Sequence, residues 1–321
     1  MMKRKTLAAA VIALAMTGAA SAEDYPSHPV RIVFPLAAGG GGDVFTRALA
    51  DELQKAWHQP VVVENRPGGG QNIGARACAE GTPDGYTLCV MSSEPAVYNQ
   101  FLYKSIPYDP EKDFQPIANL FFNTLAVVIN PDTKVKTFAG MIATAKAQPG
   151  KLSYGTFAFP AQVFMNQLNK TEGTDIVWVP YKGGGEVVNA VLSGNTQIAV
   201  LALSNMVALL QSGRITPLAV VSNSRSPLFP NVPTLEEVRP GASLRPTWFG
   251  LFTQTGVPRP IVEKVAATAD RIMAEPAFRK RLYTDRGVEP ASERLEAFAS
   301  FVREQRKLAA QTVKDSGQEP K

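Results

Sequence analysis

The sequence predicts an α/β protein of two domains, and three observations support this prediction. Short apolar runs alternate with longer stretches in which apolar residues recur every three or four positions, a pattern typical of parallel strands joined by helices. Glycine-rich loops follow several of the apolar runs. About 300 residues remain after the leader described next, which is enough for two hydrophobic cores.

The first 22 residues have the pattern of a secretory signal peptide. Three basic residues at positions 3–5 precede an apolar run at 7–16 that is too short to span a bilayer, and Ala20-Ser21-Ala22 forms a small-residue cleavage site. We therefore expect cleavage after Ala22 and a periplasmic location. No later stretch is long and apolar enough to cross a membrane.

Loss of this leader lowers the formal net charge from +5 to +2, because the leader contains three basic residues and no acidic one. A net charge this near zero favours neither nucleic acid nor an anionic membrane surface as a partner. We expect a monomer without a nucleic-acid partner and without a cofactor.

The first strand, glycine loop and helix predict an anion site. Residues 30–34 are expected to form a strand that Pro35 ends, because proline has no N–H to donate. Four glycines at 39–42 follow, and Asp43 is the expected N-cap of a helix with apolar residues at every fourth position. Free backbone N–H groups and the positive helix end favour a carboxylate or phosphate. The alternative is a tight turn without a ligand, and no phosphate-loop motif is present.

A second glycine loop and two further strands follow. Strands are predicted at 60–65 and 86–91, and the glycine loop at 66–74 opens a helix that ends at Ala79. Ser92-Ser93-Glu94 stands at the end of the later strand. Ligands of parallel sheets bind outside the carboxyl ends of the strands, so the three loops are expected to converge on one cleft.

A second set of α/β elements is predicted from about Leu120 onward. The remaining strands are expected at 125–129, 152–155, 176–180, 198–203, 218–221 and 248–252, and the remaining helices at 138–147, 161–168, 186–192, 260–274 and 295–313. Tyr181, Lys182 and three glycines follow the strand at 176–180, and we expect Lys182 at the rim of the cleft.

The sequence predicts no catalytic residue and no metal site. Its two histidines, His28 and His58, fall away from the carboxyl ends of the strands, and it holds no G-x-S-x-G elbow, H-E-x-x-H or paired metal-ligand spacing. The two cysteines, Cys78 and Cys89, could pair in an oxidising compartment, or they could be two separately buried thiols.

Short motifs spread over the whole mature chain resemble those of one family. They are Tyr25-Pro26-Ser27, P-x-x-A-G-G-x-x-D at 35–43, Val62-Val63-Glu64-Asn65-Arg66-Pro67-Gly68, Asn72-Ile73-Gly74, Pro83-Asp84-Gly85-Tyr86-Thr87-Leu88, Tyr108-Asp109-Pro110, Asp113-Phe114, Pro180-Tyr181-Lys182-Gly183-Gly184 and Pro230-Asn231-Val232-Pro233-Thr234. In this order they resemble the substrate-binding proteins of tripartite tricarboxylate transporters, the TctC or Bug family.

The resemblance implies a periplasmic-binding-protein fold, in which two Rossmann-like α/β domains close on a ligand like a Venus flytrap. Two crossing strands would form the hinge. Domain one would comprise residues 23–121 and 246–321, and domain two residues 122–245. The family's ligands are mostly small carboxylates, and its members pass them to membrane permease subunits, so both are implied partners.

The resemblance and the loop argument together give the candidate ligand-binding residues. They are Ala38, Gly39, Gly40 and Asp43 in the first loop, Asn72, Ser92, Ser93 and Asn99 elsewhere in domain one, and Thr156, Phe157, Phe159, Tyr181 and Lys182 in domain two.

Domain two departs from the family pattern. A polar, Gly/Ser-rich loop with a histidine is usual in the family, whereas this chain has aromatic residues at 157 and 159 and the apolar pair Leu201-Ala202. Burying a distal charge without partners would be costly, so we expect a monocarboxylate with an apolar or aromatic body. Alternatively, Phe157 and Phe159 point into the core and Thr156 faces the ligand.

Two other functions remain open. A ligand-presenting sensor component of a signalling system would have the same fold and site, so the sequence does not separate uptake from sensing. A secreted hydrolase is the rival enzyme class, with Lys182 as its only candidate group. A lysine at the rim of the cleft, or one that pairs with the opposite domain, is the favoured interpretation of Lys182, so we expect binding without turnover.

Overall fold

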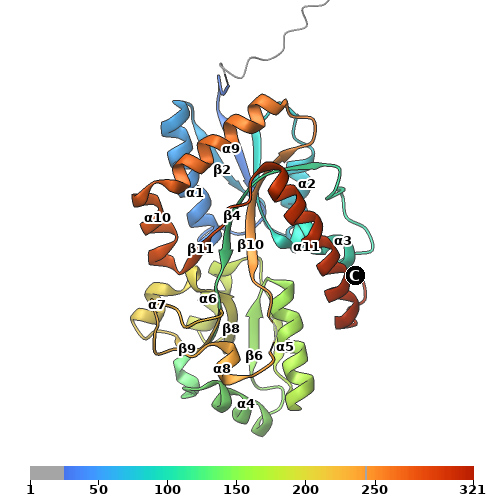
Figure 1. Cartoon of the computed structure of the whole chain (residues 1–321). Helices are drawn as coiled ribbons and strands as arrows, with labels where there is room; N and C mark the ends of the chain where they lie inside the picture. The colour runs from blue at the N-terminus through green and yellow to red at the C-terminus, as the bar shows by residue number, and fades with distance from the viewer. Residues whose placement is uncertain (1–24, 243) are drawn as a thin grey trace, which may run out of the picture.

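The computed structural model describes residues 25–242 and 244–321, which form two α/β lobes, one above the other (Figure 1). The predicted signal peptide lies outside the described residues. The strands are β1 Val30–Phe34, β2 Val61–Asn65, β3 Thr87–Ser92, β4 Phe114–Asn123, β5 Leu125–Ile129, β6 Ser153–Thr156, β7 Val177–Pro180, β8 Ile198–Ala202, β9 Thr216–Val221, β10 Thr247–Gln254 and β11 Val288–Pro290. The helices are α1 Gly41–Trp57, α2 Asn72–Ala79, α3 Asn99–Leu102, α4 Phe138–Ala147, α5 Phe159–Glu172, α6 Gly184–Leu192, α7 Val207–Gln211, α8 Leu235–Val238, α9 Arg259–Ala274, α10 Pro276–Leu282 and α11 Leu295–Ser316.

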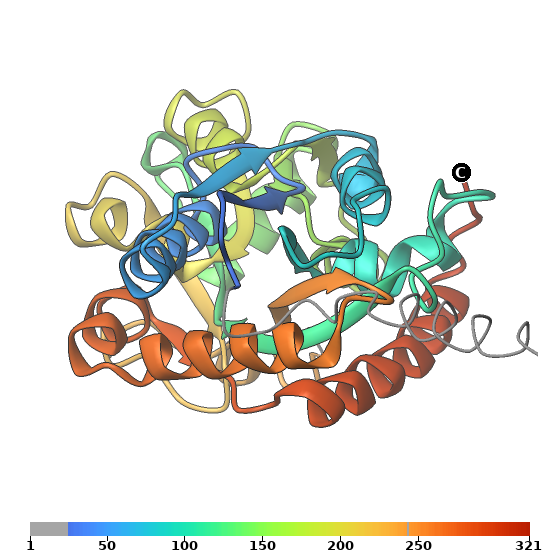
Figure 2. The ribbon, with the colours of Figure 1, turned by 90° about the horizontal axis from the view of Figure 1, so that it is seen from above.

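The first lobe is built on a six-stranded sheet in the order β11-β4-β10-β3-β1-β2. Strands β1, β2 and β3 are parallel, whereas β10 runs antiparallel to both β3 and β4. Helices α1 and α9 contribute the apolar residues that cover one face, and α2 and α11 cover the other. In the view from above, α9 (orange) and α11 (red) both run along the lower edge of the picture, because each packs against β4 (Figure 2).

The second lobe is built on a five-stranded sheet in the order β7-β6-β8-β5-β9. Strands β6, β7 and β8 are parallel, and β5 is antiparallel to its two neighbours. Residues of α4 and α5 bury one face, and residues of α6 bury the other. Each sheet is thus a buried layer between helices, as the sequence predicted, but both sheets are mixed and not parallel throughout.

Two neighbouring strands carry the chain between the lobes. β4 continues into β5 with only Thr124 between them, and β10 returns from the second lobe beside β4. At the boundary Asn123 lies opposite Thr247, and its side-chain amide donates to the Thr247 hydroxyl at 3.0 Å. The lobes are therefore connected through two paired strands, at the place where the family resemblance implies a hinge.

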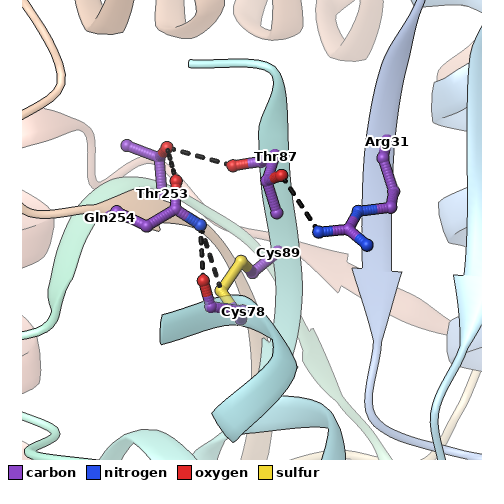
Figure 3. The surroundings of a disulfide bond; sticks show 6 residues. All are labelled: Arg31, Cys78, Thr87, Cys89, Thr253 and Gln254. Atoms are coloured by element: carbon purple, nitrogen blue, oxygen red, sulfur yellow. Dashed lines mark hydrogen bonds between the residues drawn. A yellow bond between two sulfur atoms is a disulfide. The ribbon is translucent and has the colours of Figure 1, made fainter. Parts of the chain in front are cut away.

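A disulfide joins Cys78 of α2 to Cys89 of β3 (Figure 3). Both cysteines are fully buried. The side-chain amide of Gln254 in β10 donates to the carbonyl of Cys78 at 2.6 Å, so α2 is tied to two strands of the sheet. The two cysteines therefore form a disulfide and are not two separately buried thiols.

The predicted N-cap was wrong, and several elements were not predicted. Asp43 is not the N-cap of α1, because the helix begins at Gly41 and its N-cap is Gly40. The ten-residue strand β4 was missed, because polar residues and a proline interrupt its apolar pattern. Helix α10 and strand β11 were also missed, since both are short and depend on packing against the first sheet.

Candidate ligand-binding cleft

A cavity of about 390 Å³ lies in the cleft between the lobes. Segments that follow the carboxyl ends of β2, β3, β6 and β7 form its walls, in the place where parallel sheets bind ligands. The lining residues are Leu36, Gly68, Gly69, Gly70, Gln71, Glu94, Asn99, Leu102, Tyr103, Gln318 and Lys321 from the first lobe, and Thr156, Phe157, Ala158, Phe159, Gln162, Trp178, Pro180, Tyr181 and Lys182 from the second. Cavities of this size suit small organic molecules.

The loop after β2 forms its part of the wall mostly with backbone. Gly68, Gly69 and Gly70 have φ values of +114°, +57° and +63°, which glycine adopts without strain. A Cβ on Gly70 would lie 2.0 Å from the hydroxyl oxygen of Tyr103. Gln71 has φ +77° despite its side chain, and backbone strain of this kind is found preferentially at functional sites.

The loop after β1 contacts the second lobe directly. The N–H of Gly41 donates to Oδ1 of Asn205 at 2.7 Å, and the N–H of Ala37 donates to the carbonyl of Lys182 at 3.4 Å. A Cβ on Gly40 would lie 3.2 Å from the same Asn205 oxygen. Glycine at positions 40 and 41 therefore allows the two lobes to contact each other closely.

Asp43 stabilises this first loop from the first turn of α1. Its carboxylate accepts hydrogen bonds from the N–H of Gly39 at 3.0 Å, from Arg47 at 3.0 Å and from the amide of Asn65 at 2.9 Å. Burial opposes ionisation, but these hydrogen bonds outweigh it and hold the pKa of Asp43 below its usual value. All of these partners are protein groups, so Asp43 acts on the shape of the loop.

Glu94 is a fully buried acid in the wall of the cavity, at the start of a π-helical turn that spans Glu94–Tyr98. Its Oε2 lies 2.5 Å from the hydroxyl of Ser92, and its Oε1 accepts the N–H of Phe159 from the second lobe at 3.3 Å. Burial raises the pKa of Glu94 above its usual value, and the hydrogen bonds only partly offset this effect.

The second lobe supplies the aromatic wall. Phe157 is half-buried, and Trp178 is half-buried with its indole N–H 3.5 Å from the carbonyl of Thr156. Phe159 is only 5% exposed and packs against Tyr98 of the first lobe at 5.5 Å between ring centres. Lys321 of the first lobe places its ammonium group 5.2 Å from the centre of the Trp178 ring, a cation–π contact across the cleft.

The cavity brings together six of the thirteen predicted site residues, namely Asn99, Thr156, Phe157, Phe159, Tyr181 and Lys182. Gly40 and Asp43 line a separate pocket of about 10 Å³ beside it. The other five line neither: Ala38 and Gly39 are exposed, and Asn72, Ser92 and Ser93 are buried behind the wall. Asn72, for example, accepts a hydrogen bond from Asn99 at 2.7 Å. Contact of any of these residues with a ligand stays a prediction.

Sequence reasoning missed several lining residues, above all Glu94, Gln71 and Asn205 at the contact between the lobes. Glu94 directly follows two residues that were selected, and its position before a proline at a strand end was the available signal. No signal in the sequence indicated Asn205, because its role depends on the approach of the other lobe. Within the described residues, no group of three or more acidic, histidine or cysteine side chains could hold a metal ion.

Two α/β lobes joined by paired strands around a cavity have the architecture of the solute-binding proteins. Residues 45–317 match the family described as tripartite tricarboxylate transporter family receptor. The chain belongs to this family, and it is not an enzyme.

Known relatives cover three quarters or more of the chain. Protein BugT of Bordetella pertussis is 35% identical over 248 residues, which is 75% of each chain. The structure titled R. palustris Rpa4515 with adipate is 26% identical, with a TM-score of 0.87 over 93% of this chain and 100% of the other. MatC from Rhodopseudomonas palustris with bound malate is 26% identical, with a TM-score of 0.83 over 90% and 100% of the two chains.

Proposed function

We propose that this protein captures a small carboxylate in the periplasm and delivers it to the membrane permease subunits of a tripartite tricarboxylate-type transporter. Two structurally similar proteins were crystallised with adipate and malate, which supports a carboxylate as the ligand class. Within the described residues, no helix is long and apolar enough to cross a membrane. We further propose export by the predicted signal peptide, with cleavage after Ala22, and a monomer in solution.

The ligand that we propose is a monocarboxylate with an apolar or aromatic body. The observation that supports it is the second-lobe wall, where Phe157 and Trp178 face the cavity and Lys182 stands at its exposed rim. An aromatic ligand stacked on such a ring gains about 0.5–1.5 kcal/mol beyond burial. A second carboxylate without a partner would lose about 1–3 kcal/mol.

We also propose that residues 23–121 with 246–321 and residues 122–245 are two domains that open and close about β4 and β10. Ligand that contacts both lobes binds the closed form better and shifts the population toward it.

Tryptophan fluorescence tests the proposed function. Trp178 is the half-buried indole in the cavity wall, whereas Trp57 and Trp248 are buried in the first lobe. We expect saturable quenching or shift of the emission with benzoate, phenylacetate or hexanoate, without chemical change of the acid on prolonged incubation. Trp178→Phe should abolish most of the signal. Absence of saturable binding to every acid of a broad carboxylate panel, tested by calorimetry, would contradict the proposal.

The aromatic wall gives a second prediction. Phe157→Ala should weaken the binding of phenylacetate about twofold to tenfold relative to acetate, because the ring contact is lost. Phe159→Ala should instead lower the unfolding temperature, since Phe159 is almost fully buried against Tyr98. The measurements are calorimetric titration and thermal unfolding of each variant. If Phe157→Ala kept the wild-type ratio of phenylacetate affinity to acetate affinity, the Phe157 ring would not contact the ligand.

A further inference from the structure

Glu94 is an unusual residue to find in a cleft that binds acids. It is 4% exposed, and it is the only acidic side chain among the cavity-lining residues of the described chain. Within the described residues, no lysine or arginine forms an ion pair with it. A buried carboxyl without a counter-ion is costly, so its presence in the wall requires a reason.

The contacts of Glu94 supply that reason, because its carboxyl group lies at the start of helix α5 in the other lobe. Oε1 accepts the N–H of Phe159, the first residue of this 14-residue helix, at 3.3 Å. The helix's own N-cap residue, Ala158, has no side-chain oxygen to do this. Free N–H groups and the positive helix end attract a carboxyl group. Glu94 therefore caps, from the first lobe, a helix that begins at the cavity.

Short hydrogen bonds hold the carboxyl group of Glu94 in place within the first lobe. The hydroxyl oxygen of Ser92 lies 2.7 Å from the side-chain amide of Gln71 and 2.5 Å from Oε2 of Glu94, and the hydroxyl of Ser93 donates to the same Oε2 at 3.4 Å. Burial raises the pKa of Glu94, and these hydrogen bonds only partly offset this effect. The carboxyl group is therefore fixed at the start of α5 by partners on its own lobe.

The other charged and titratable groups near Glu94 are few. Tyr98 follows it in the same turn and also has a pKa raised by burial, with Arg245 as a further neighbour of that tyrosine. Lys182 and Lys321 line the cavity at exposed positions. None of these groups is an acid that could take the place of Glu94 at α5.

We propose that Glu94 is a specificity-determining residue, whose carboxyl group occupies the place at the start of α5 that the second carboxylate of a ligand would take. The cleft then accepts acids with one carboxylate and excludes those with two. This inference rests on the proposed function, since it assumes a carboxylate ligand. A second ligand carboxylate at this place would have to displace the carboxyl group of Glu94 from the Phe159 N–H, which would leave a buried carboxyl group without that hydrogen bond.

Matched pairs of acids test this proposal by calorimetry. Adipate carries a second carboxylate where hexanoate has its terminal methyl group, and 1,4-phenylenediacetate differs from 4-ethylphenylacetate in the same way. Wild-type protein should bind the monoacid of each pair at least about tenfold more tightly. Glu94→Ala frees the start of α5, so this ratio should fall about tenfold or reverse. Glu94→Gln keeps an oxygen that can accept the Phe159 N–H, and it should restore part of the discrimination.

Controls separate this proposal from the proposed function. Glu80→Ala removes an exposed acid of the same lobe and should keep the wild-type ratio. Without ligand, hydrogen exchange of the Phe159 amide should be faster in Glu94→Ala than in Glu94→Gln. This difference would show that Glu94→Ala has lost the hydrogen bond at the start of α5 while the protein remains folded. Diacids that bind wild type as tightly as monoacids, or an unchanged ratio in Glu94→Ala, would overturn the role of Glu94 and leave carboxylate binding standing. If no acid binds any variant, carboxylate binding itself is wrong, and the Glu94 proposal falls with it.

Discussion

Gly41→Ala is expected to weaken ligand binding on the order of tenfold to a hundredfold. Gly41 belongs to the first lobe, and a Cβ at this position would lie 2.3 Å from Oγ and 2.8 Å from Cβ of Ser204 in the second lobe. The hydroxyl can rotate away, but the Cβ and the backbone of Ser204 cannot move without separating the lobes. Under the proposed closure of the lobes on the ligand, a wedge between the lobes costs affinity, about 1.4 kcal/mol for each factor of ten.

Calorimetry and solution scattering check this result together. Ligand should reduce the radius of gyration of the wild-type protein, and it should do so less in Gly41→Ala. The unfolding temperature without ligand should change little, since no core residue of either lobe is altered. Ser204→Gly in the Gly41→Ala background removes the two closest atoms and should recover part of the affinity. Wild-type affinity in Gly41→Ala would mean that binding does not need this contact.

Removal of the disulfide by the double substitution Cys78→Ala and Cys89→Ala is expected to lower the free energy of unfolding by about 3 kcal/mol. The bond closes a short loop, with a sequence separation of 11 residues, and both sulfur atoms are buried, so loss of packing adds to the entropic effect. For a chain of this size the unfolding temperature should fall by roughly 5–10 °C.

Thermal unfolding with and without a thiol reductant provides the control. Reductant should lower the unfolding temperature of the wild type toward that of the double variant and should leave the double variant unchanged. The bond also links α2 and β3, whose flanking loops contribute Gln71 and Glu94 to the cavity, so weaker ligand binding is expected in parallel. Equal unfolding temperatures of wild type and variant would show that the disulfide does not support the fold.

Much of the fold could be predicted from periodicity and turn chemistry. The strand at 125–129 and the helix at 138–147 were predicted at their observed limits, because a buried apolar run and a clear helical period mark them. The mixed direction of the sheets was not predictable in this way. Strand direction is set by how β10 and β5 pair over long distances, and alternation of elements along the chain carries no information about it.

The candidate site was predicted less completely, for a physical reason. The sequence shows which loops follow strands, and six of the predicted residues do meet in the cavity. It does not show which N–H groups another lobe will satisfy. The glycine loop at 39–42 was expected to offer backbone N–H groups to an anion, but in the structure Asn205 accepts the N–H of Gly41. Likewise Glu94 gains its position from Phe159, which is 65 residues away in the chain.

The contact between the lobes at Gly40 and Gly41 bears on how substitutions can change the ligand specificity of such a receptor. The contact from Ala37 to Gly41 involves backbone atoms and Asn205, and it lies beside the cavity instead of inside it. Closure therefore brings the same outer surfaces together for any molecule that fits the cavity. Under the proposed transport function, substitutions in the cavity wall can retune which solute is carried while the shape presented to a membrane partner is conserved. Selectivity and docking are separable traits in this architecture.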